Sequence, residues 1–276
     1  MSIGISLAAA LVYGAGDFLG GLASRRTALL TALLLSQGIG LAGIALIAAL
    51  IGGDASGTDL LLGAAAGLAG GAGVAMLYRG LATGAMSLVA PITGVVAVVV
   101  PVAYGVARGE RPAALQFAGI GLAIVAVTLL SASGAGRPRL ARSTLLLALG
   151  SGVAFGTFYI AFARTSAAAN LWPLLSARGA SVAVLMLLAL ILRRPLRLGA
   201  TPPAIVIGAG VCDVTANARY LIAVHGGLIS IVAVIVSLYP VATVMCSVLF
   251  LGERLHTRQI AGVLTALGAV VLITAT

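Results

Sequence analysis

Ionisable and amide side chains stand inside long apolar stretches of this chain, where solvated residues are not expected. Asp213, Asn217 and Tyr220 follow at i, i+4 and i+7, so on a helix they share one face. Asp17 lies in another apolar stretch, with Tyr13 one helical turn before it. A carboxyl group in a low-dielectric cavity keeps its charge only beside a cation, so Asp17 or Asp213 could bind a proton or the amine of a substrate.

Two further polar residues, Arg178 and Gln37, lie in separate apolar stretches. An arginine there could hold a substrate carboxylate through two parallel hydrogen bonds. Together with Asp17 and Asp213, Arg178 would suit a zwitterion such as an amino acid. A plainer interpretation is equally open, in which Asp213 and Arg178 pair with each other and lock the helices together. Asp17 could likewise reach interfacial water, and Asn217 could join two helices.

The composition indicates which elements must position these residues. Of 276 residues, 61% are hydrophobic and 8% are charged, whereas a soluble domain carries about 25% charged residues. The apolar stretches are continuous and roughly 20 residues long, enough for a helix to span a bilayer. We therefore predict an all-α integral membrane protein with ten transmembrane helices, the first of them retained rather than cleaved as a signal peptide. The expected spans are 2–24, 28–51, 60–82, 86–108, 113–132, 143–163, 170–192, 203–224, 228–250 and 256–275.

The net charge of +10 comes from a chain that has arginine but no lysine. The arginines gather between the apolar stretches, where they are typical topology signals rather than a nucleic-acid site. Ten fall in odd-numbered loops and three in even-numbered loops, which predicts odd loops in the cytoplasm and both termini outside. Without lysine no P-loop can form, so no ATP is expected. No cofactor or metal is expected either, because Cys212 and Cys246 lack CxxC spacing and the two histidines are isolated.

The two halves of the chain carry a weak internal duplication. A shift of 143 places the Gly-Glu-Arg of residues 109–111 on the Gly-Glu-Arg of residues 252–254. We predict a first five-helix repeat over residues 1–132, a basic connecting loop over 133–142 and a second five-helix repeat over 143–276. Because five is odd, the second repeat would be inverted in the membrane, an arrangement typical of transporters.

A family resemblance rests on the end of each half. Pro240 precedes the motif Leu-Gly-Glu-Arg-Leu at residues 251–255, and residues 109–112 carry a weaker copy, Gly-Glu-Arg-Pro. Arg178 stands where an arginine is often found in the second helix of the unit. In these features the chain resembles the EamA family of the drug/metabolite transporter superfamily, which includes YddG-like exporters of amino acids and metabolites. The resemblance implies alternating access between two five-helix units. It also implies that both termini lie in the cytoplasm, whereas the arginine count predicts that they lie outside.

Some residues are expected to shape the bundle rather than to touch substrate. Pro91, Pro101 and Pro240 would kink their helices and could frame a cavity or act as hinges. Glu110 and Glu253 would pair locally or cap the next helix N-terminus.

Small and aromatic residues recur as well. Gly63, Gly67 and Gly71 repeat every four residues, a spacing that lets helices approach closely. The aromatic residues that could line a cavity are Tyr13, Tyr78, Tyr104, Tyr159, Tyr220, Tyr239 and Trp172.

These features together favour a secondary transporter and not an enzyme. It would move small metabolites, first of all amino acids or related compounds, across the cytoplasmic (inner) membrane of a bacterium, with export favoured. The expected partners are a small-molecule substrate and membrane lipid, the chain acting as a monomer, with proton coupling or exchange left open. Multidrug or toxic-compound efflux is the alternative, followed by a channel. The substrate-binding residues would be Tyr13, Asp17, Gln37, Arg178, Asp213, Asn217 and Tyr220.

Overall fold

The structure is a computed structural model, and it describes residues 2–24, 27–81, 86–131, 141–193, 196, 198–252 and 257–275. Every regular element in these ranges is helical. Glu253 lies outside the described residues, as does most of the basic connecting loop. The helices are α1 (Ser2–Ser24), α2 (Leu29–Ile51), α3 (Gly57–Leu81), α4 (Met86–Ala107), α5 (Ala114–Ser131), α6 (Arg142–Ala163), the short 3-10 helix η1 (Ala167–Ala169), α7 (Trp172–Ile191), α8 (Pro203–His225), α9 (Ile229–Val236), α10 (Tyr239–Leu251) and α11 (Thr257–Thr274).

Eight segments are long and apolar enough to cross a membrane, and two shorter apolar helical segments lie in α4 and α5. Large side chains such as Leu50, Leu61 and Phe250 are exposed on the outer helix surfaces, where lipid would cover them. The predicted all-helical membrane fold is therefore confirmed. That α4 and α5 also cross the bilayer, giving ten spans, stays a prediction.

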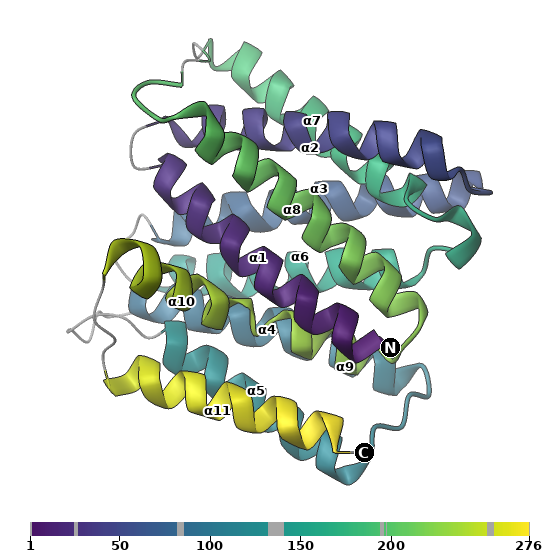
Figure 1. Ribbon diagram of the computed structural model, residues 1–276, viewed down its shortest axis with the longest axis vertical. Helices are drawn as coiled ribbons and strands as arrows, with labels where there is room; N and C mark the ends of the chain where they lie inside the picture. The colour runs from purple at the N-terminus through teal and green to yellow at the C-terminus, as the bar shows by residue number, and fades with distance from the viewer. Residues whose placement is uncertain are drawn as a thin grey trace.

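The helices lie side by side in one bundle, and both termini lie on the same side of it (Figure 1). Helices of the first half pack mainly on helices of the second half. The contact of α1 with α8 recurs as the contact of α6 with α3, and α5 packs along α11. Two structurally related halves would produce this reciprocal packing. The division of the chain into two five-helix repeats, joined by residues 133–142, stays a prediction.

Glycines bring α3 and α7 into backbone contact. A Cβ atom at Gly63 would collide with the Pro173 carbonyl group, and one at Gly67 would collide with that of Ala177. Gly71, which we expected on the same packed face, has open space where its Cβ atom would be. The close contact therefore ends between Gly67 and Gly71, and it fixes the part of α7 that precedes Arg178.

The prolines act differently in the two halves. The fourth helix of the first half, α4, is continuous through Pro91 and Pro101. Its counterpart is broken after Val236 into α9 and α10, and Pro240 stands in the first turn of α10. A proline in the first helical turn has no backbone hydrogen bond to lose. Pro240 therefore begins a helix instead of kinking the interior of one.

Hydrogen bonds tie the loops together on the side of the bundle that holds the termini. We call this side the terminal face, defined by residues 52–56, 164–171 and 226–228. Asp59 accepts a hydrogen bond from the Ser166 backbone N–H at 2.6 Å. It also accepts from the backbone N–H and hydroxyl of Ser56, the residue before α3, and its own N–H donates to the Ser56 hydroxyl, as in a capping box. This carboxylate thus joins the first half of the chain to the second.

Glu110 makes a second connection on the terminal face. Its carboxylate accepts hydrogen bonds from the Ile229 N–H at 2.7 Å, the Ser230 N–H at 3.0 Å and the Ser230 hydroxyl at 2.5 Å. Glu110 therefore caps α9, which lies in the other half, and not the helix that follows it in sequence. A negative charge at a helix N-terminus also stabilises the helix dipole. All eight residues of α9 are buried, so the cap anchors a core element.

Candidate functional site

A cavity of about 600 Å³ lies between the two halves of the bundle. Residues of α1 to α8 line it, together with residues around the break between α9 and α10. It reaches from the middle of the bundle toward the side opposite the terminal face, because Leu29 and Val206 near the starts of α2 and α8 belong to its wall. The polar residues of the wall are Tyr13, Asp17, Ser36, Gln37, Thr93, Tyr159, Arg178, Ser181, Asp213, Asn217, Ser237 and Tyr239.

A chain of hydrogen bonds crosses one wall of this cavity. The Tyr13 hydroxyl on α1 donates to Asn217 Oδ1 on α8 at 2.7 Å. The Asn217 amide donates to Asp213 Oδ1 at 3.2 Å and to the Asp213 carbonyl at 2.7 Å. Asp213 Oδ2 in turn lies 2.5 Å from Arg178 Nη2 on α7. Asp213 and Asn217, one helical turn apart in the sequence, thus belong to a hydrogen-bonded network that joins α1, α7 and α8.

The structure shows the pairing of Arg178 with Asp213 that we left open as the plainer interpretation. The Arg178 side chain is 11% exposed and that of Asp213 is 39% exposed, so the arginine is the more deeply buried partner. Arg178 Nε and Gln37 Oε1 are buried and have no hydrogen-bond partner among the described residues. An orphaned buried group is costly, and such groups mark sites where a ligand or a second conformation completes the bonding.

Asp17 lines the same cavity and has no cationic partner among the described residues. Within the part of the chain that the structure describes, the ion pair of Arg178 with Asp213 is the only one. Asp17 is exposed to the cavity, and Gly20 and Gly21 beyond it also belong to the wall. Its negative charge is therefore available to a cation that enters the cavity.

Aromatic and apolar residues form another part of the cavity wall. Phe155, Phe158 and Tyr159 on α6 line it at i, i+3 and i+4. Gly70 and Gly71 of α3 also line the cavity, and Gly70 lies against the Phe158 ring. The sequence analysis did not select the two phenylalanines, although their helical spacing is the signal that could have found them.

Tyr220 has a different place from the one we expected. It is fully buried and does not line the cavity. Its ring packs against that of Tyr159 with centroids 4.7 Å apart, and its hydroxyl donates to the Tyr159 carbonyl at 3.0 Å. Tyr220 therefore supports the cavity wall from behind, and Tyr159 is the tyrosine of this pair that a ligand can touch.

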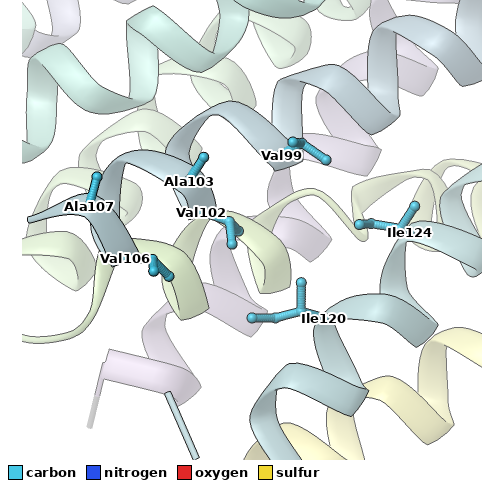
Figure 2. A pocket seen from close by; sticks show the side chains of 7 residues that line it. All are labelled: Val99, Val102, Ala103, Val106, Ala107, Ile120 and Ile124. Atoms are coloured by element: carbon cyan, nitrogen blue, oxygen red, sulfur yellow. The ribbon is translucent and has the colours of Figure 1, made fainter. Parts of the chain in front are cut away.

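A second hollow lies on the outside of the bundle between α4 and α5 (Figure 2). Its side chains are all aliphatic, and they offer no hydrogen-bonding or charged group to a polar metabolite. The residues that line it are Val99, Val102, Ala103, Val106, Ala107, Ile120 and Ile124. The central cavity is therefore the candidate site.

The described residues hold no cluster of three or more His, Cys, Asp or Glu side chains that could bind a metal ion. Among the described residues of the cavity wall, the charged side chains are those of Asp17, Arg178 and Asp213. They can bind an ion or a polar molecule by charge and hydrogen bonding.

Comparisons with known proteins agree with this architecture. Residues 142–275 match the model of the EamA-like transporter family. Among 28 matching chains of solved structures, one titled "Crystal structure of protein" has a TM-score of 0.78 at 17% sequence identity, with 99% of this chain and 96% of that chain covered. This likeness shows the fold alone. No curated protein matches the sequence. The resemblance seen in the sequence is thereby confirmed over residues 142–275, where this multi-pass membrane protein matches the EamA-like transporter family.

Proposed function

We propose that this transporter moves small amine-bearing metabolites, amino acids or related compounds, through the central cavity by alternating access. The observation that carries the proposal is a polar, charged cavity built jointly by both halves of a membrane-spanning bundle. Charged groups inside a membrane protein are expensive to bury and are kept where they serve a pathway. Asp17 would bind the amine of the substrate, with the tyrosines of the wall beside it.

The arrangement of loops supports export. On the terminal face, hydrogen bonds of Asp59 with Ser166 and of Glu110 with Ser230 hold segments of the two halves together. The cavity extends toward the opposite side, where α1, α5, α7 and α10 end, and arginine-rich stretches follow these helices in the sequence. Arginine-rich loops favour the cytoplasm. In this proposal the described conformation faces the cytoplasm of a bacterium and receives substrate there for export across the inner membrane.

The energy source proposed is a gradient or an exchange. A carboxyl group without a cationic partner in a low-dielectric cavity can take up a proton when no other cation is bound. Asp17 is placed for this role, since it shares the cavity with the substrate. Proton antiport and substrate exchange are both compatible with such a group, and the function requires no ATP.

Counterflow in liposomes tests the proposal. Purified protein would be reconstituted and given a panel of labelled amino acids, their amides and common amines, and wild type would be compared with Asp17→Asn and Arg178→Gln. Asp54→Asn is the matched control, because this exposed carboxylate lies on the terminal face and outside the cavity. Saturable exchange that Asp17→Asn reduces at least about tenfold and Asp54→Asn retains would support the proposal. Ion conductance without saturation would replace it with a channel.

The aromatic wall favours one alternative. Phe155 and Phe158 add aromatic rings to the cavity that Asp17 also lines. Flat, hydrophobic cations would pack on these rings, as expected of a multidrug efflux protein. If the protein exchanges flat cationic dyes and does not exchange any small amine, this alternative is favoured.

A further inference from the structure

We propose that the central cavity selects amine-bearing monocations over the corresponding zwitterions. This inference rests on the proposed transport function and narrows its substrate class. Among amino acids and related compounds, the preferred substrates would be those that lack a charged carboxylate, such as amino acid amides, esters and decarboxylated amines.

The first support is the charge balance of the cavity. Three charged side chains belong to its described wall: Asp17, Asp213 and Arg178. The ion pair cancels one negative against one positive charge, so the wall retains one uncompensated carboxyl group, that of Asp17. A monocation neutralises this charge, whereas a zwitterion brings a negative charge with its positive one. In a low-dielectric cavity an uncompensated charge is costly, so the monocation is favoured.

The second support is the occupation of Arg178. A substrate carboxylate would need this arginine as its partner, because no other cationic side chain lines the described wall. Asp213 Oδ2 already lies 2.5 Å from Arg178 Nη2, and Asn217 holds the same carboxylate from its other oxygen. To bind Arg178 closely, a substrate carboxylate would have to displace or crowd Asp213. Either event leaves like charges together in a buried place.

The third support is the hydrogen bonding that remains free. Among the described residues, Arg178 Nε has no hydrogen-bond partner, and neither has Gln37 Oε1. A neutral carbonyl oxygen can accept from such a nitrogen without adding negative charge, and an ammonium group can donate to the glutamine oxygen. An amino acid amide offers both groups, and its side chain can lie on the wall formed by Phe155 and Phe158. The polar groups and the net charge of the cavity therefore favour the same kind of ligand.

Matched ligands test the inference directly. Leucine and leucinamide, and phenylalanine and phenylalaninamide, have nearly the same shape and differ in net charge. Calorimetric titration of the purified wild-type protein in detergent should show each amide binding at least about tenfold more tightly than its amino acid. Equal affinity, or tighter binding of the amino acids, overturns the inference. So does the absence of binding by every amide in the series.

Charge variants of the cavity locate the cause. Asp17→Asn removes the uncompensated charge, so the ratio of amide to amino acid affinity should fall toward one. The double variant Asp213→Asn with Arg178→Gln removes one charge of each sign and leaves the net charge unchanged, so the ratio should persist. A ratio that persists in Asp17→Asn and vanishes in the double variant would refute the assignment to Asp17.

The same proteins separate this inference from the transport function. Counterflow of leucine that equals or exceeds counterflow of leucinamide would reject the selectivity and keep the transporter. Tight binding of leucinamide without any counterflow would keep the selectivity and reject the transport function.

Discussion

Asp213 Oδ2 lies 2.5 Å from Arg178 Nη2 and joins α8 to α7 at the wall of the central cavity. Removal of one partner leaves the other charge without compensation, whereas removal of both leaves none. We therefore expect Asp213→Asn and Arg178→Gln each to destabilise the protein, and the double variant to be about 1–3 kcal/mol more stable than additivity predicts. Thermal unfolding in detergent measures this coupling. Strictly additive losses would show that the pair contributes nothing as a pair.

Asp17 should behave in the opposite way with respect to stability. It has no cationic partner among the described residues, so Asp17→Asn removes an uncompensated charge and breaks no ion pair. We expect unchanged or increased thermal stability and at least a tenfold loss of exchange. Unfolding in detergent and counterflow in liposomes, made on the same preparation, check both parts. Full exchange activity in a stable Asp17→Asn protein would remove this residue from the site.

Glu110 and Gln116 provide a comparison of two helix caps. Glu110 accepts three hydrogen bonds at the start of the buried helix α9, whereas Gln116 accepts one from the Ala113 N–H at the exposed start of α5. Glu110→Gln loses the charge and turns an NH₂ group toward donors, so we expect a cost of about 2 kcal/mol. Gln116→Ala should cost about 0.5 kcal/mol or less, since water can replace the bond.

The two losses would be measured by thermal unfolding. Ser230→Ala added to Glu110→Gln should cost less than Ser230→Ala alone, because the two groups share one hydrogen bond. Equal costs for the two caps would contradict the anchoring role of Glu110.

The glycines of α3 should differ in their tolerance of a methyl group. Gly63→Ala and Gly67→Ala place a Cβ atom against the α7 backbone, and we expect each to destabilise the protein by about 1–3 kcal/mol. Gly71→Ala points into open space, so its better helix propensity should make it neutral or stabilising by up to about 1 kcal/mol. Thermal unfolding of the three variants decides this. A loss in Gly71→Ala as large as in Gly67→Ala would refute the described packing.

The orientation in the membrane can be tested at two helix ends. In a background with Cys212→Ala and Cys246→Ala, a cysteine would be placed at Asp54 or at Ala141, which lie at opposite sides of the bundle. A membrane-impermeant maleimide should label Asp54→Cys in intact cells and Ala141→Cys only after permeabilisation, if arginine-rich loops face the cytoplasm. The reverse pattern would place the termini inside and turn the described cavity toward the outside.

The sequence predicted the elements well because helix formation in lipid depends on local composition. Residues 2–24 and 203–224 were predicted as spans, and α1 and α8 cover almost the same ranges. It also placed Asp17, Asp213, Asn217 and Arg178 in spans, and all four line one cavity. A charge in an apolar stretch is a strong signal, since few positions in a bundle can hold it.

The relationships between helices could not be predicted in the same way. Periodicity places Tyr220 on the face of Asp213 but does not show that α6 covers that end of the face with Tyr159. Likewise Gly71 continues the spacing of Gly67 although α7 has already left α3 at that level. Glu110 caps a helix 119 residues away. Each of these facts depends on which helix lies opposite, and that is a property of the whole bundle.

The Tyr13 hydroxyl has its partner on Asn217, 204 residues later in the chain. The helix that carries Tyr13 and Asp17 packs most extensively on α8, so its polar residues enter the membrane long before their neighbours are synthesised. During biogenesis α1 must wait beside the insertion machinery or in lipid with these groups unsatisfied. A nascent chain that stops before α8 leaves the Tyr13 hydroxyl without its Asn217 partner in the bilayer. The bond between Tyr13 and Asn217 can therefore form only after most of the chain has been synthesised, so this part of the cavity is assembled late.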